Sequence, residues 1–280
     1  MENNDEVDLQ NEYKGILNQD KKKRIIIYGI IAAIILILLI IIIKLLIGKK
    51  EIDMVKEFDY YLFAFQCPMN FCYTLKDYKN ITKCINKTKN FEKGKLTIHG
   101  LWPSILNKEV KEIAHISCNK GKTIPITINN KSDIYDKINK YWPSGNKENN
   151  LFWTHEYNKH GYCYNARKNI STQDYEAYFK EVIRVFEEKK LYDLITDLYG
   201  VKSSYELNVT ELQSKIKNKI NGTIYISCVM INNTQYINEF QVAFDFNYSY
   251  IENKNIIPFG RNKCNESVNA FLKYNEDIII

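Results

Sequence analysis

The hydrophobic pattern of the chain begins with one long apolar run. Ile25 to Ile43 holds 19 consecutive residues without a charge, nearly all isoleucine and leucine, and Leu45 to Ile47 extend the run beyond Lys44. At about 1.5 Å per residue, a helix of this length just crosses a hydrocarbon core of roughly 30 Å. A cleaved signal peptide is the alternative, but its apolar region is usually about 7–15 residues long and ends near a small-residue cleavage site. We therefore expect an uncleaved signal anchor, one transmembrane helix over residues 25–47.

Beyond the anchor, the apolar pattern becomes that of a folded domain. Segments rich in aromatic and β-branched residues predict strands over Tyr60 to Gln66, Lys95 to Gly100, Thr223 to Ile231 and Glu239 to Phe246. Helical periodicity fits Ser132 to Tyr141, Asn150 to Gly161, Thr172 to Tyr199 with a break near Lys190, and Thr210 to Ile220 with Thr210 as N-cap. Strands and helices do not alternate regularly, so we expect an α+β domain over residues 58–280, with an antiparallel sheet packed against several helices.

Composition and charge narrow the class of protein. The chain is 45% hydrophobic and 13% aromatic, which excludes intrinsic disorder. Its formal net charge of +6, from 39 Lys and Arg against 33 Asp and Glu, is too small to indicate nucleic-acid binding through counterion release. The charge therefore says little about partners.

Cysteines and glycosylation sequons indicate the side of the membrane on which the domain lies. Lysines flank both ends of the apolar run, so the positive-inside rule favours a cytosolic N-terminus by a small margin. All seven cysteines follow the anchor without a C-x-x-C pair, which is typical of disulfides in an oxidising compartment. Nine N-x-S/T sequons also follow it, more than chance would give: Asn80, Asn86, Asn130, Asn169, Asn208, Asn221, Asn232, Asn247 and Asn265. We expect a cytosolic tail (1–24), a linker (48–57), and a lumenal or extracellular glycosylated domain in the secretory or endolysosomal system or at the cell surface.

Three of the four histidines lie in two short segments dense in Trp, Gly and Glu. The first segment, Leu96 to Pro103, contains His99, and the second, Phe152 to Cys163, contains two more; His115 belongs to neither and is expected to be an ordinary surface residue. On a helix that turns about 100° per residue, four polar side chains of the second segment share an arc of about 140°. They are His155, Lys159, Glu156 and His160. A solvated helix face usually pairs Glu with Lys at four-residue spacing, so this cluster is better explained as a functional site.

The pair His155-Glu156 begins like the zinc-binding motif H-E-x-x-H. That motif needs its second histidine four residues after the first, so that both imidazoles point at one metal. Here the second histidine, His160, comes five residues later, about 140° away around the helix. We expect neither a metal nor another cofactor.

Phosphoryl transfer on RNA suits these residue types without a metal. One imidazole can deprotonate a hydroxyl while a second, protonated, gives its proton to the leaving oxygen, because histidine titrates near neutrality. A lysine and a further protonated histidine can stabilise charge on the equatorial oxygens of the phosphate. RNA carries its own nucleophile, the 2′-hydroxyl, so no Ser or Cys is required.

The two segments closely resemble, in residues, order and spacing, the two catalytic segments of the ribonuclease T2 family, which are secreted or lysosomal acid endoribonucleases with an α+β fold. The resemblance covers roughly Tyr61 to Cys264 and implies cleavage of single-stranded RNA to 2′,3′-cyclic phosphate ends. It implies that His160 is the general base and His99 the general acid. The residues by themselves do not show which histidine is the base and which is the acid. By the same resemblance His155 binds phosphate, and Glu156 with Lys159 stabilises the transition state. Trp102 contacts either the substrate or the core.

The resemblance also implies disulfides, and it has departures. By position, the pairs that resemble family disulfides are Cys72–Cys84, Cys118–Cys163 and Cys228–Cys264. The remaining Cys67 stands where the family usually has Trp, and is either a buried small apolar residue or part of an intermolecular bridge. Tyr157 replaces a usual Trp and Tyr162 a usual Thr or Ser. None of these changes touches a residue expected to transfer protons.

Two other classes of function compete with the enzyme. A catalytically inactive RNA-binding or signalling ectodomain could use the same fold, since fold does not determine function. Loss of His99 or His160 would have favoured it, and both are present. A disulfide-rich adhesion ectodomain predicts no convergent His, Lys and Glu site. The sequence indicates no obligate protein partner.

Overall fold

The computed structural model describes residues 21, 23–24, 26–44, 58–75, 78–88, 91–105, 118–119, 121, 123–252 and 263–274. The predicted linker 48–57, most of the predicted cytosolic tail, and His115 lie outside these residues. The chain divides into two units, Met1–Met54 and Val55–Ile280, and each is described by itself. In the first unit a single helix, Ile26–Lys44, has 19 residues and a mean hydropathy of 3.5, with its side chains exposed. Its length and composition are those of a helix that can cross a membrane, and a signal sequence near an N-terminus meets the same criteria.

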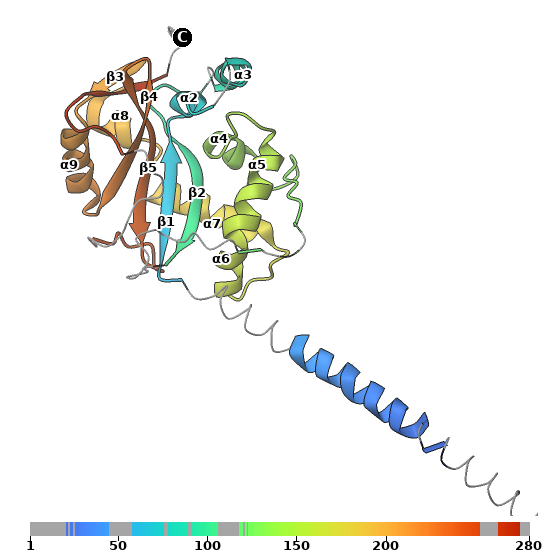
Figure 1. Cartoon of the computed structure of the whole chain (residues 1–280). Helices are drawn as coiled ribbons and strands as arrows, with labels where there is room; N and C mark the ends of the chain where they lie inside the picture. Colours follow the sequence, from blue (N-terminus) through green and yellow to red (C-terminus); the bar gives the residue numbers. More distant parts are fainter. Residues whose placement is uncertain are drawn as a thin grey trace, which may run out of the picture. The chain divides into compact units, whose positions relative to one another are not determined.

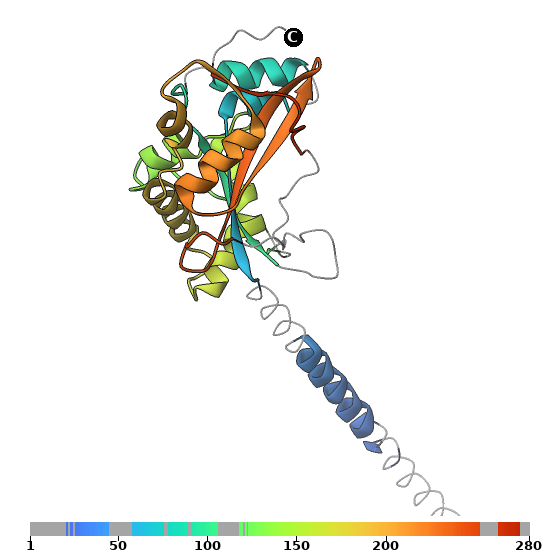
Figure 2. The same ribbon diagram turned by 90° about the vertical axis from the view of Figure 1, so that its left-hand side faces the viewer.

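The second unit combines one sheet with several helices (Figures 1 and 2). The described helices are α2 (Pro68–Cys72), α3 (Tyr78–Thr88), α4 (Tyr135–Tyr141), α5 (Asn149–Glu156), the π-helical turn η1 (Tyr157–Gly161), α6 (Tyr162–Arg167), α7 (Tyr175–Glu188), α8 (Leu194–Tyr199) and α9 (Val209–Ile220). The strands are β1 (Tyr60–Gln66), β2 (Thr97–Ser104), β3 (Ser204–Leu207), β4 (Ile224–Ile231), β5 (Thr234–Phe244) and β6 (Ala270–Lys273). This is the α+β class that the pattern predicts.

Local side-chain chemistry explains where two of the helices begin. The carboxylate of Asp174 accepts a hydrogen bond from the backbone N–H of Ala177 and starts α7, three residues later than predicted. Asn208, and not Thr210 as predicted, is the N-cap of α9: its backbone is extended and its side chain accepts from the N–H of Glu211. Asn and Thr are both common N-cap residues, and the sequence analysis chose Thr210 although the cap is Asn208, two positions earlier.

The sheet is antiparallel except for one pair. Its strands run in the order β2-β1-β5-β6-β3, with β4 also paired to β5, and only β5 and β6 are parallel. The short strands β3 and β6, four residues each, pair with one another and were not predicted. β5 starts at Thr234 rather than Glu239 because Asn232 and Asn233 both have positive φ, 48° and 61°, the geometry of a two-residue hairpin turn.

All seven residues of β1 are buried, and they divide between two faces because successive side chains of a strand point in opposite directions. Tyr61, Phe63 and Phe65 enter the main core, which also contains side chains from α7. Tyr60, Leu62 and Ala64 face a smaller cluster with Trp102 and Ala243. In Figure 1, α4, α5 and α6 lie beside β2, whereas α8 and α9 lie near β4 and β5. The smaller cluster on β1 and β2 contains Trp102, which belongs to the candidate site described below.

Three disulfides connect segments that are distant in the sequence. They are Cys72–Cys84, Cys118–Cys163 and Cys228–Cys264, the pairs that the resemblance implies. Cys67 is a free, buried thiol. Its Sγ contacts the carbonyl oxygen of Lys273 at 3.3 Å, and burial raises its pKa to about 11. The expectation of a buried small residue at this position is therefore correct.

Candidate active site

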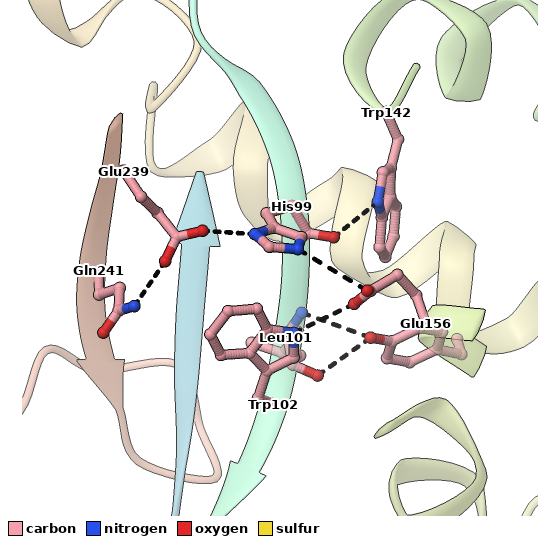
Figure 3. A network of polar contacts seen from close by, with 8 residues as sticks. His99, Leu101, Trp102, Trp142, Glu156, Glu239 and Gln241 are labelled. Carbon is pink, nitrogen blue, oxygen red and sulfur yellow. Dashed lines mark hydrogen bonds and ion pairs between the residues drawn. The ribbon is translucent and has the colours of Figure 1, made fainter. Parts of the chain in front are cut away.

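A β-bulge places the first histidine. In the pairing of β1 with β2, Ala64 opposes Gly100 and Phe65 opposes Ile98, so His99 is the extra residue of β2 and has no direct partner on β1. Bulges change the direction in which a strand side chain points and are common beside active sites. The indole Nε1 of Trp142 donates to the backbone carbonyl of His99 at 2.9 Å and holds the bulge in place (Figure 3).

The second histidine segment forms a continuous helix with a π-helical turn in its middle. The backbone N–H of Tyr162 donates to the carbonyl of Tyr157, five residues earlier, which is the hydrogen bond of a π-helix. The helix continues to Arg167, beyond the predicted end at Gly161. An angle of 100° per residue therefore does not hold across this turn. Glu156 and His160 are buried, whereas His155 is exposed and Lys159 is partly exposed.

The π-helical turn is fastened to a neighbouring segment. The Cys118–Cys163 disulfide joins the two, and the backbone N–H groups of Cys118 and Asn119 donate to the carbonyls of Lys159 and Asn158 at 3.1 and 3.0 Å. The amide nitrogen of Asn158 donates to the carbonyls of Ile124 and Thr154, at 2.8 and 2.7 Å. Its amide oxygen accepts from the N–H of Ile124, at 2.8 Å. These contacts position the part of the helix that carries Lys159 and His160.

Trp102 is the side chain on which the two segments converge. Its indole Nε1 donates to Oε2 of Glu156 at 3.1 Å (Figure 3). Its ring lies edge-on to the imidazole of His99, with centroids 5.0 Å apart, and stacks with the imidazole of His160 at 5.4 Å. Oε1 of Glu156 lies 3.9 Å from Nε2 of His99. The site therefore has two imidazoles in contact with one indole, with a buried carboxylate next to the indole N–H.

The surroundings shift the pKa values of the site residues in different directions. Burial lowers the pKa of His99, but the carboxylates of Glu239 and Glu156 raise it by more, and the net shift is upward. Burial, Lys159 and other cations nearby lower the pKa of His155. Burial raises the pKa of Glu156, although His99 and the N–H of Trp102 oppose that shift. The site thus favours a protonated His99 and a neutral His155.

The structure brings together most of the predicted site residues. His99, Trp102, Glu156 and His160 are in direct contact, and Lys159 lies close enough for its charge to lower the pKa of His99, His155 and Glu156. Trp102 is 3% exposed, so the contacts seen are those of packing and hydrogen bonding, and its contact with substrate stays a prediction. Within the ranges that the structure describes, no three His, Cys, Asp or Glu side chains are grouped so that they could bind a metal ion.

Sequence reasoning missed one residue of the site. Nδ1 of His99 contacts Oε2 of Glu239, which the sequence analysis placed at the start of a strand and gave no role. Glu239 is buried on β5, 140 positions away from His99 in the sequence. A carboxylate next to the alternating apolar residues of a buried strand is a signal of a polar contact, but the sequence does not show with which residue.

Comparison with known proteins identifies the family. A model of the Ribonuclease T2 family matches residues 58–264. The chain belongs to the ribonuclease T2 family. This confirms the resemblance that the two histidine segments carry, and the match covers nearly all of the second unit.

Several relatives are ribonucleases of this family. Ribonuclease DdI of Dictyostelium discoideum is 34% identical over 121 residues, 43% of this chain and 47% of that protein. Extracellular ribonuclease LE of Solanum lycopersicum is 26% identical over 223 residues, 78% of this chain and 88% of that protein. The matches span only 43% of the ribonuclease T2-like 1-A protein of Candida albicans and 58% of ribonuclease Rh of Rhizopus niveus.

Solved structures of the family have the same fold. RNase NT, crystallised with 5′-AMP, aligns with a TM-score of 0.56 and 21% identity over 78% of this chain and 98% of that one. The S3-RNase of Japanese pear aligns with a TM-score of 0.56 and 22% identity over 76% of this chain and 100% of that one. The α+β fold predicted from the sequence is therefore that of ribonuclease T2 structures.

Proposed function

We propose that the chain is a membrane-anchored endoribonuclease of the T2 type. It cleaves single-stranded RNA by transphosphorylation and leaves 2′,3′-cyclic phosphate ends, without a metal or other cofactor. The observation that carries the proposal is the convergence of His99 and His160 on Trp102, beside the buried carboxylate of Glu156. Family membership supports the same chemistry.

His160 and His99 then carry out the two proton transfers of the reaction. His160 takes the proton of the 2′-hydroxyl, and the 2′-oxygen forms a bond to phosphorus. The bond from phosphorus to the 5′-oxygen breaks, and His99 gives its proton to that oxygen. The raised pKa of His99 supports this assignment, because a general acid must be protonated before the reaction.

The remaining polar residues act on the charge of the phosphate. Negative charge develops on the two nonbridging oxygens of the phosphate, and Lys159 and His155, on the more exposed side of the helix, supply the cationic or hydrogen-donating groups that stabilise it. Glu156 contacts both Trp102 and His99, and so fixes the position of the general acid His99 relative to the indole of Trp102. A non-catalytic ectodomain would have no need of these contacts.

Location is the second part of the proposal. The helix Ile26–Lys44 anchors the protein in the membrane with the N-terminus cytosolic, and the ribonuclease domain lies in the lumen of the secretory or endolysosomal system or outside the cell. The hydropathy of the helix supports the anchor. The three disulfides support an oxidising compartment.

The test follows cleavage of RNA homopolymers by the detergent-solubilised full chain in excess EDTA, with analysis of the product ends. We expect cyclic phosphate ends from the wild type, and His99→Ala and His160→Ala each to lower the rate by about 10²–10⁴, the usual contribution of a general acid or base. His115→Ala, a histidine outside both segments, is the matched control and should keep full activity. Activity that needs a metal, 5′-phosphate products, or two unimpaired mutants would each refute the mechanism.

A further inference from the structure

We infer that Glu239 is a positioning residue for His99: its carboxylate accepts the Nδ1 proton of His99 and so directs the Nε2 proton to the substrate. The inference rests on the proposed role of His99 as the general acid. It concerns a residue that belongs to neither histidine segment, on a strand that does not pair with the strand of His99.

The sheet is built so that this contact can form across a strand. β1 lies between β2 and β5, and its Ala64 opposes Gly100 on β2 and Gln241 on β5. Two small residues, Ala64 and Gly100, thus leave room on this face of the sheet. The bulge in β2 places His99 above that space, and Glu239 reaches it from the other side (Figure 3).

The side chain of Gln241 holds the carboxylate of Glu239 in position. Its Oε1 accepts a hydrogen bond of 2.5 Å from Nε2 of Gln241, and its Oε2 contacts Nδ1 of His99. Glu239 and Gln241 are both buried, at 6% and 2% exposure. An ionised carboxylate only accepts hydrogen bonds, so the proton of this contact lies on Nδ1 of His99. Nε2 is then the nitrogen that exchanges protons with a substrate.

The charges around His99 come from three elements. Glu239 on β5 and Glu156 on α5 favour its protonated form, whereas Lys159 on η1 disfavours it; His155 on α5 is also coupled to it electrostatically. His160, stacked on Trp102, is the remaining titratable group of the site. Glu239 is the carboxylate in hydrogen-bonding contact with the ring, and Oε1 of Glu156 is 3.9 Å away. Removing the charge of Glu239 therefore lowers the pKa of His99.

The experiment compares Glu239→Gln with wild type, using the full chain in detergent. Glutamine has nearly the same shape and can still accept from Nδ1, but it carries no charge. We expect kcat/KM to fall by about 10–10²-fold near neutral pH, less than the loss of the acid itself. The alkaline limb of the pH profile should move to lower pH, because His99 then loses its proton at lower pH. Glu239→Asp keeps the charge and should restore the position of the limb in part.

A matched control and a second measurement separate this effect from a loss of fold. Glu206→Gln makes the same chemical change at an exposed residue of β3, at the other edge of the sheet, and should leave the pH profile unchanged. Histidine side-chain NMR of the ¹⁵N-labelled chain, which has four histidines, reports the pKa and tautomer of His99 without any assay of activity. Glu239→Gln should lower that pKa, because the amide carries no charge, and should keep the Nδ1-protonated tautomer, because its oxygen still accepts from Nδ1.

The outcomes distinguish the inference from the proposed function. If wild type does not cleave RNA, the proposed function fails, while NMR still tests whether Glu239 controls the tautomer and pKa of His99. If wild type cleaves RNA but Glu239→Gln leaves the alkaline limb and the pKa of His99 unchanged, the inference is wrong. If Glu239→Gln does not fold, the pH profile and the histidine NMR of Glu239→Asp test the inference instead. The shorter carboxylate must still alter the hydrogen bond to His99.

Discussion

Gly100 leaves room for the hydrogen bond between Trp102 and Glu156. A Cβ atom at this position would lie 2.3 Å from Nε1 of Trp102 and 2.4 Å from Oε2 of Glu156. Both atoms belong to the hydrogen bond that joins the two histidine segments, so the bond and an added methyl group cannot occupy the same space. The requirement is steric and not conformational, because the positive-φ glycines of the described residues are Gly94 and Gly200, and Gly100 is not among them.

Gly100→Ala therefore tests the packing of the site. We expect the variant to lose at least about tenfold in RNA cleavage, and to lose about 1–3 kcal/mol of stability, the usual cost of overpacking a buried site. Steady-state kinetics and thermal unfolding measure the two effects. Gly121→Ala is the control, since its Cβ would meet only the Asn119 side chain at 3.3 Å in an exposed turn. Full activity in Gly100→Ala would show that the bond from Trp102 to Glu156 is dispensable.

At the scale of elements, the π-helical turn η1 forms the middle of the second histidine segment. It carries the buried His160, whereas His155 on the preceding helix α5 is exposed. A π-helical turn has less favourable backbone geometry than an α-helix, so contacts outside the helix must support it. Asn158 supplies several of them through its side-chain amide.

Asn158→Ala should weaken this support. Loss of the amide leaves backbone groups of Ile124 and Thr154 without their partners, at a cost of about 1–3 kcal/mol. The melting temperature of the second unit should fall by roughly 2–4 °C for each kcal/mol lost, and cleavage activity should fall with it. Differential scanning calorimetry with an activity assay measures both. Asn218→Ala, an exposed position on α9, should change neither, and an equal effect of the two variants would contradict the role of Asn158.

At the scale of the whole molecule, the nine sequon asparagines bear on topology. All nine are exposed: Asn80, Asn86, Asn130, Asn169, Asn208, Asn221, Asn232, Asn247 and Asn265. They are distributed over helices, turns and caps from α3 to the residues before β6. A glycan could therefore be accommodated at each position without unfolding the domain. Their exposure is the condition that glycosylation in the lumen would require.

The topology is tested in sealed microsomes. Protease added outside should remove an epitope tag from the N-terminus and leave the ribonuclease domain intact, and glycosidase should then reduce the mass of the protected fragment. The tag is the internal control for protease activity, and detergent should abolish protection. Digestion of the ribonuclease domain in sealed vesicles would show that the predicted orientation is wrong.

Local signals in the sequence determined much of this protein. The aromatic and β-branched runs predicted β1 and β4 almost to the residue, since both strands consist largely of these strand-forming residue types. Two short histidine segments indicated the family and four contacting residues of the site, because that chemistry requires particular side chains at particular spacings. Cysteine positions, taken with the family, implied the three disulfides.

Only the tertiary structure decided how these parts meet. The π-helical turn is in contact with Cys118, Asn119 and Ile124, which lie more than 30 residues earlier in the chain, and the local sequence pattern predicted only a regular helix there. The short pair β3 and β6, and the parallel pairing of β5 with β6, arise from contacts between segments far apart in the chain. Glu239 meets His99 across β1, at a separation of 140 residues. Strand order and a bulge bring these two side chains together, and neither is a property of the residues near them in the sequence.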